Sequence, residues 1–254
     1  MLRFLHNFRQ RLLRENKFSK YLLYAIGEIL LVVIGILIAF QVDNWNESEK
    51  QRRTSREFIV RLQKEVKRNI SYAETEIATE EAQSHAAKTI LHLFNEPNSG
   101  GYGSQLDSLV YIILSNNTVE IVTGTLNEGF NTGNVAIIPS DSLRLSLYNM
   151  PSMIEELRKQ EEIDREDVNG HFTNFLYHHF NYRNMDDQFS PYRGSIGPTK
   201  FTEYSNRNLL DSQTFENMVD NRFWNSQEQL NQLKKFHAEL ILIESLIEKM
   251  LTFG

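Results

Sequence analysis

The sequence predicts an all-α protein, with one N-terminal transmembrane helix followed by a bundle of long helices outside the membrane. Three observations predict it: one uninterrupted apolar run, several long stretches with apolar residues spaced three and four apart, and no paired strand pattern. The 254 residues carry a net charge of −6 and a mean hydropathy of −0.43, which excludes a polytopic membrane protein. The hydrophobic fraction of 41% is too high for a disordered chain. With no cysteine, disulfides and cysteine-type zinc sites are excluded.

A basic arm opens the chain at residues 1–20, with six basic residues against one acid, Glu15. Its apolar residues recur at helical spacing, which is typical of a helix lying on anionic lipid headgroups. A plain positively charged flank would fit the same residues, so both interpretations stay open.

The apolar run spans residues 21–42, and Glu28 is its single charged residue. A helix of this length covers about 33 Å, which matches the hydrocarbon core of a bilayer. Tyr21 and Tyr24 at one end and Trp45 beyond the other suit the aromatic belts at the two interfaces. A buried helix of a soluble protein and a cleaved signal peptide are the rival interpretations. The length of the run and the lack of an A-x-A cleavage site favour an uncleaved signal anchor.

Flanking charges give the expected orientation. Six basic residues precede the span and four lie in residues 43–57, which favours a cytoplasmic N-terminus. Residues 43–254 hold 21 basic and 31 acidic residues, a net charge of −10. Such a domain suits the periplasm better than contact with nucleic acid or anionic lipid. We therefore expect a single-pass protein of the bacterial inner membrane with its C-terminal domain, residues 43–254, in the periplasm.

The first half of this domain reads as one long helix at 44–95, a loop at 96–105, and short helices near 105–115 and 122–132. The letters VEIV at 119–122 suggest a strand, but no partner strand is evident.

In the second half, Ser140 or Asp141 is placed to cap a helix running towards Phe180, and Pro151 is expected to kink it. Residues 183–213 read as a long mobile loop that could also form a binding surface. The last helix is expected at about 214–252.

The stretch Lys20–Glu47, KYLLYAIGEILLVVIGILIAFQVDNWNE, resembles an uncharacterised family of single-span membrane proteins that is common in Bacteroidetes. Gly27, Glu28, Gly35 and the exit Asn44–Glu47 carry the resemblance. A weaker likeness lies at 123–150, in Thr132-Gly133 and Leu143-Arg144. The resemblance implies the topology and the helical fold, and it implies no activity.

Glu28 is the most informative single residue, since a carboxylate at the centre of a bilayer costs about 2.5–3.5 kcal/mol on insertion scales. It could couple to ions, or it could lie near the headgroups or stay protonated against a partner helix. Gly35 and Ala39 form a small-xxx-small pair with Gly27 on the same stripe, which would allow close helix approach.

No catalytic, metal or cofactor site emerges from the spacing. His85 and His92 are seven residues apart, as are His171 and His178, so each pair is about 10 Å apart and cannot chelate one ion. No phosphate-binding loop or nucleophile motif occurs.

We therefore expect a non-enzymatic membrane protein that acts as a scaffold, accessory subunit or sensor-like module. The alternative is a subunit of an ion-coupled membrane complex that uses Glu28. Besides the lipid bilayer, its expected partners are a second copy of itself or another membrane protein, and nucleic acid is not expected.

Overall fold

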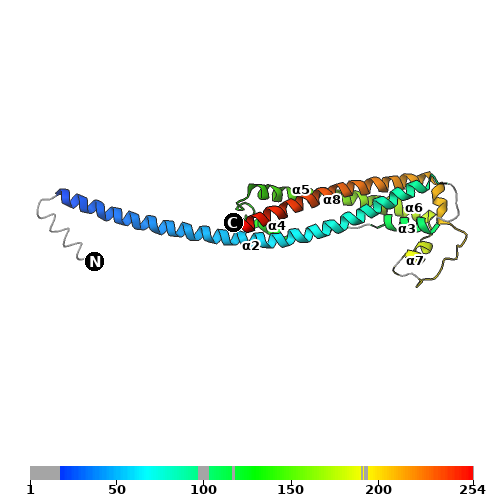
Figure 1. Cartoon of the computed structure of the whole chain (residues 1–254), viewed down its shortest axis with the longest axis horizontal. Coiled ribbons are helices and arrows are strands. Elements are labelled where there is room, and N and C mark those ends of the chain that lie inside the picture. The colour runs from blue at the N-terminus through cyan, green and yellow to red at the C-terminus, as the bar shows by residue number, and fades with distance from the viewer. Residues whose placement is uncertain (1–17, 97–102, 116–117, 190, 192–193, 254) are drawn as a thin grey trace. The chain divides into compact units, whose positions relative to one another are not determined.

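The computed structural model describes residues 18–96, 103–115, 118–189, 191 and 194–253, and these are helices joined by turns and irregular segments, with no strand among them (Figure 1). The all-α prediction is confirmed. The chain divides into two compact units, Met1–Glu57 and Phe58–Gly254, which we describe separately. Of the predicted basic arm at 1–20, only residues 18–20 lie within the described part.

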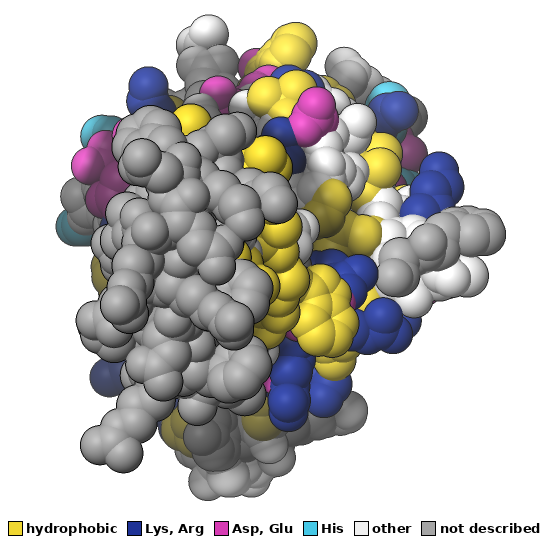
Figure 2. Space-filling view, turned by 90° about the vertical axis from the view of Figure 1, so that its left-hand side faces the viewer, with side chains coloured by type: hydrophobic (Ala, Val, Ile, Leu, Met, Phe, Trp, Pro, Cys, Tyr) yellow, Lys and Arg dark blue, Asp and Glu magenta, His cyan; other side chains and the backbone are white. Residues whose placement is uncertain are grey.

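Helix α2 (Phe18–Leu93) begins before the apolar run and continues to the end of the helix expected at 44–95, so the two predicted helices are one element. It is the one described helix that is long and apolar enough to cross a membrane. In the first unit its apolar side chains are exposed, Leu31 to 73%, because no other described residues cover them. Figure 2 is viewed from the end at which α2 begins and shows hydrophobic side chains at the surface.

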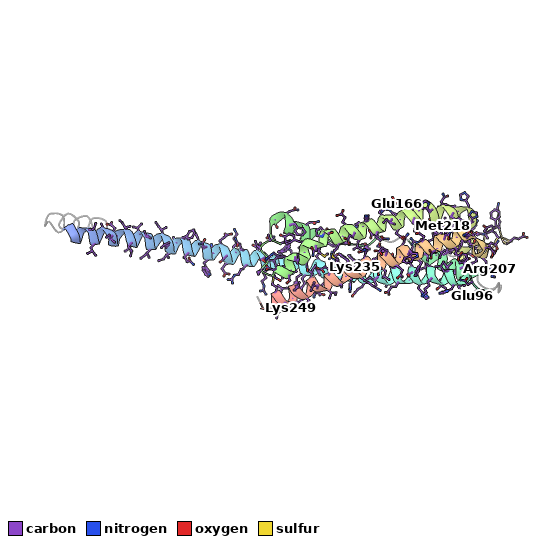
Figure 3. All side chains as sticks on the ribbon, turned by 90° about the horizontal axis from the view of Figure 1, so that it is seen from above. Glu96, Glu166, Arg207, Met218, Lys235 and Lys249 are labelled. Atoms are coloured by element: carbon purple, nitrogen blue, oxygen red, sulfur yellow. The ribbon has the colours of Figure 1, made fainter. Side chains whose placement is uncertain are left out.

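Three long helical stretches run side by side in the second unit: the second half of α2, α5 (Asp141–Glu166) and α8 (Gln213–Phe253). Of the two candidates, Ser140 caps α5, since its hydroxyl accepts a hydrogen bond from the backbone N–H of Leu143 at 3.3 Å. Helix α8 returns alongside the others. In Figure 3, Glu166 and Met218 lie towards one end of the bundle, and Lys249 lies at the other.

Ion pairs show that α2 and α8 are antiparallel. Lys67 lies 3.5 Å from Glu244, and Glu81 lies 2.8 Å from Lys234, so residue numbers fall along α8 as they rise along α2. These pairs are half exposed and each stabilises the bundle only slightly. They show how α2 and α8 are aligned, but they contribute little to determining that alignment.

The helix expected to run from Ser140 to Phe180 is divided in three. Helix α5 continues through Pro151, then a π-helical segment η1 (Asp167–Phe172) intervenes, and α6 (Thr173–His179) follows. Such π-helical turns are rare and are frequent near functional sites.

The two short helices are confirmed as α3 (Gly103–Ile113) and α4 (Gly124–Thr132). Residues 119–122 form no strand. Their backbone groups bond to side chains instead: both the N–H and the C=O of Val122 pair with the Asn69 amide at 2.8 Å, and the Val119 N–H donates to Glu161 at 2.7 Å. The Glu65 carboxylate then caps α4 by accepting from the N–H groups of Thr125 and Leu126.

The predicted loop at 183–213 contains two helical segments, α7 (Tyr182–Phe189) and the 3₁₀ helix η2 (Asn206–Asp211). Each places one apolar side chain, Met185 or Leu209, in the core. A hydrogen bond also connects η2 to α3, since the Asn206 amide donates to the Asp107 carboxylate at 2.6 Å.

The second unit has two apolar cores. The first gathers α2 residues from Phe58 onward with α4, α5 and the C-terminal half of α8. The second gathers the end of α2 with α3, α6, α7, η2 and the start of α8. On α2 the cores are separated at residues 80–84, where the buried side chains are polar.

Gly129 in α4 packs directly against the first core. A Cβ atom added there would lie 2.4 Å from Cζ of Phe58 and 3.0 Å from Cγ2 of Val135. Phe58 is fully buried, so its ring has no free space to turn into.

We predict that Gly129→Ala destabilises the protein by about 1–3 kcal/mol, because overpacking outweighs the gain in helix propensity. Thermal unfolding of the full chain in detergent, followed by circular dichroism, should show a fall of several degrees in Tm. Gly170→Ala is the matched control, since nothing among the described residues lies within 4 Å of its added Cβ. Equal Tm values for the two variants would contradict the packing argument.

Candidate functional site

A layer of polar side chains crosses the bundle between the two apolar cores. It consists of Glu80 and Gln83 from α2, Asp164 from α5, and Arg222 and Ser226 from α8; we call it the polar layer. All but Asp164 are at most 7% exposed. Buried polar groups of this kind must satisfy one another, because water cannot reach them.

Arg222 lies at the centre of the polar layer and its side chain is 1% exposed. Its guanidinium pairs with the Asp164 carboxylate and donates to the side-chain oxygen of Gln83 at 3.1 Å. Within the described part of the chain, its Nε has no hydrogen-bond partner. One cation therefore holds together side chains from three helices.

Acidic groups outnumber this cation. Burial, the Asp164 charge and the Glu76 charge raise the pKa of Glu80 to about 7, although Arg222 and a hydrogen bond with Ser226 oppose the rise. Burial also raises the pKa of Asp167, against the effects of Arg222 and Asn221. The polar layer therefore holds a carboxyl group that titrates near neutral pH.

An open groove lies on the surface in front of the polar layer. It consists of two adjacent hollows of about 570 Å³ each, both lined by Thr75 and Thr79 of α2. Its described lining comprises Ser71, Tyr72, Thr75, Glu76, Ala78, Thr79, Ala82, Gln83, Tyr111, Ile112, Ser115, Thr118 and Glu120.

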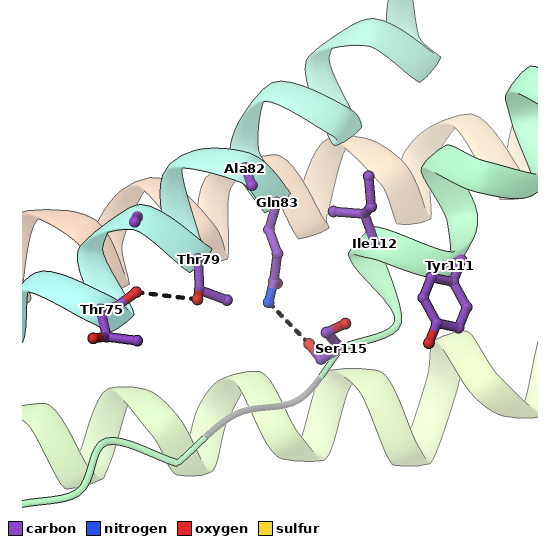
Figure 4. Close-up of a pocket in the computed structure, with 8 residues that line it drawn as sticks. Thr75, Thr79, Ala82, Gln83, Tyr111, Ile112 and Ser115 are labelled. Atoms are coloured by element: carbon purple, nitrogen blue, oxygen red, sulfur yellow. Dashed lines mark hydrogen bonds between the residues drawn. The ribbon is translucent and has the colours of Figure 1, made fainter. Parts of the chain in front are cut away.

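Gln83 belongs to both the groove and the polar layer. Its amide nitrogen donates to the backbone oxygen of Ser115 at 3.1 Å (Figure 4). Its side-chain oxygen accepts from Arg222. Figure 4 also shows Tyr111 and Ile112 across from the α2 residues. The buried cation therefore positions the side chain that secures this wall of the groove.

The residues singled out in the sequence lie elsewhere, in the first unit. Gly27, Glu28, Gly35 and Ala39 are exposed residues of α2, and a Cβ added to either glycine meets nothing within 4 Å among the described residues. Trp45 is exposed and Tyr24 is half-buried, whereas the side chain of Tyr21 lies outside the described part. The roles assigned to these residues stay predictions.

Among the described residues, no group of three His, Cys, Asp or Glu side chains could hold a metal ion. His178 bonds through Nδ1 to the backbone oxygen of Asn174 at 3.0 Å, and His237 lies 3.5 Å from Glu74. The first contact lies within α6, and the second joins α8 to α2.

Sequence reasoning missed the polar layer. A signal was present: the apolar stripes of α2, α5 and α8 are each interrupted by polar residues, at 80–84, 158–167 and 225–229. Such interruptions read as solvated surface unless the pairing of the helices is known.

A family described as a family of unknown function (DUF6090) matches residues 28–155, just over half of the chain. The chain belongs to DUF6090. No curated protein and no solved structure matches it. The DUF6090 match confirms membership of an uncharacterised family, as the resemblance implied, and it includes every lining residue of the groove. Asp164 and Arg222 lie outside the matched segment of this DUF6090 member.

We predict that stability falls as pH rises from about 4.5 to about 7. Over this range the unfolded chain releases the Glu80 proton while the folded protein keeps it, so stabilisation present below pH 4.5 is lost as pH passes the folded pKa of about 7. Glu80→Gln should flatten this slope and raise stability at pH 8 by up to about 3 kcal/mol.

Thermal unfolding of the full chain in detergent at several pH values measures this effect. Glu156→Gln, an exposed carboxylate of α5, is the matched control and should leave the slope unchanged. An unaltered slope in Glu80→Gln would show that Glu80 does not hold its proton in the folded protein.

Proposed function

We propose that this protein is a non-enzymatic, single-pass inner-membrane protein whose helical domain is an interaction module, acting as a scaffold or accessory subunit. The observation that carries the proposal is helix α2, which joins an apolar, uncovered segment to a bundle with an open groove. A soluble protein would have to expose this apolar segment to water, at a cost of about 25 cal/mol per Å².

The orientation that we propose places the N-terminus in the cytoplasm and the bundle in the periplasm. Six basic residues before the span against four after it support this choice. The net charge of −10 over residues 43–254 supports a location away from the anionic inner leaflet.

An interaction role is supported by the kind of site that the bundle offers. The carboxylates of the polar layer are engaged by Arg222 and Ser226, and the groove is lined by small hydroxyl and methyl side chains, tyrosine rings and the carboxylates of Glu76 and Glu120. Two of the lining hydroxyls, those of Thr75 and Thr79, bond to backbone oxygens of their own helix rather than to a carboxylate, so neither is activated by a base as covalent catalysis requires.

We predict that alkaline carbonate leaves the full chain in the bacterial membrane pellet and that detergent releases it. A phosphatase fused after Gly254 should be active, because this enzyme needs the oxidising periplasm, and a fluorescent reporter fused there should be dark. Release by carbonate would contradict the anchor, and a bright cytoplasmic reporter would contradict the orientation alone.

We further predict that Gly35→Leu lowers association within the membrane about tenfold, because it fills the small-residue face of the span. The substitution has room within the chain itself, so its effect would report on a neighbouring molecule. Chemical cross-linking of the full chain in membranes, with identification of the cross-linked species, measures it. Leu37→Ala on the opposite face is the control.

Glu28→Gln separates the proposal from an ion-coupled role. A scaffold should tolerate this substitution, and loss of association on Glu28→Gln would argue against it. If the full chain is monomeric in mild detergent and no other protein co-purifies with it, both the scaffold role and the ion-coupled role are contradicted.

A further inference from the structure

We propose that the groove on α2 is the docking site for a basic amphipathic helix of a partner protein. The inference rests on the proposed interaction role and gives the chemistry of the partner. Three features of the groove support it: the floor, the walls and the negative charge at one end.

The floor is a face of small side chains on α2. Ser71, Thr75, Ala78 and Ala82 follow one another at steps of four, three and four, the spacing that lines up one side of a helix. This seam covers about three turns, or roughly 16 Å. A second helix with apolar residues at the same spacing could pack its side chains between these residues, as the helices of a coiled coil do.

The hydroxyls of Thr75 in the floor and of the neighbouring Thr79 bond back to their own helix. Thr75 Oγ1 donates to the backbone oxygen of Ser71 at 3.0 Å, and Thr79 Oγ1 donates to that of Thr75 at 3.1 Å (Figure 4). Hydroxyls that bond back to their own helix need no other partner. The floor is therefore more apolar than its residue types suggest, and it is shallow enough for a helix to approach closely.

Larger side chains form the walls. Tyr111 and Ile112 of α3 rise on one side, and Tyr72 lies near the other end of the groove. Tyr111 is 37% exposed although it is largely apolar. Tyrosines bordering a groove are typical of protein interfaces, because their rings bury a large area at little cost in conformational entropy.

One end of the groove is acidic. Glu76 and Glu120 both line it, and within the described residues neither forms an ion pair. Burial and the charges of Glu161 and Glu120 raise the pKa of Glu76, so these carboxylates repel one another. Arg158 neutralises only Glu161, at 2.7 Å. A lysine or arginine on an incoming helix would relieve this repulsion.

The same charge argues against a second copy as the occupant. In a symmetric dimer the groove would face itself, which would bring Glu76 and Glu120 of both copies into one interface that has no Lys or Arg among its described lining residues. A helix with an apolar face and a basic flank satisfies the floor and the acidic end together.

The test uses the full chain in uncharged detergent micelles and a fluorescent, helix-forming peptide of about 20 residues, long enough to be helical, built from Leu, Ala and Lys. Fluorescence anisotropy at about 0.15 M salt should show saturable binding below about 100 µM. The same peptide with Glu in place of Lys should not bind.

Two groove variants test the floor and the acidic end separately. Ala82→Leu fills the exposed floor, and the double change Glu76→Gln with Glu120→Gln removes the acidic end; each should weaken binding about tenfold. Their controls are Ala136→Leu and the pair Glu155→Gln with Glu156→Gln, all exposed elsewhere in the bundle, which should leave binding unchanged within about twofold.

Four outcomes would overturn the inference: no saturable binding, equal binding of the Glu peptide, equal weakening by the control pair, or a full-chain dimer that Ala82→Leu dissociates. The last would assign the groove to a second copy. Membrane retention and companion proteins are measured separately, so failure of the peptide test alone would leave the proposed interaction role standing.

Discussion

The pairing of Arg222 with Asp164 and Gln83 is the interaction on which the bundle depends. A guanidinium taken out of water costs several kcal/mol unless its charge and its N–H groups are matched. Here the matching groups come from α5 and α2, while Arg222 belongs to α8. Apolar stripes can slide past one another by a turn at modest cost, whereas sliding any of these helices would leave a buried charge alone. The polar layer therefore sets the register in which the two apolar cores can form.

A second set of contacts builds outward from the same helix. Glu65, Asn69 and Gln83 lie along α2 and bind backbone groups of the segment that leads from α3 into α4. They replace the neighbouring strand that an extended segment would otherwise need. Ser115, Val122 and the start of α4 are thereby held against α2, and Ser115, Thr118 and Glu120 line one side of the groove. Removing a carboxylate or amide from this face of α2 would release part of that wall.

Most of the fold could be predicted because helix periodicity is a local signal. Apolar residues spaced three and four apart predicted the last helix, which is α8, and Ser140 and Asp141 marked the start of α5. The division of the next helix by η1 could not be predicted, since Asp167–Phe172 carries no breaker other than one glycine. The polar layer could not be predicted for another reason. Glu80 and Arg222 are 142 positions apart in the sequence, and each resembles a surface residue unless the packing of the helices is known. The extended residues 119–122 show the opposite error, in which local strand propensity was overridden by side chains from α2 and α5.

The contact between Gly129 and Phe58 also constrains how this sequence can change over generations. Both positions fall within the segment shared with the family. If a larger residue replaced Gly129 first, the intermediate sequence would fold poorly. If a smaller residue replaced Phe58 first, it would open the space that a side chain at position 129 needs. The order of the two replacements therefore matters, and homologues should pair a large residue at one position with a small one at the other. Covariation between these two columns would record a steric dependence rather than a shared activity.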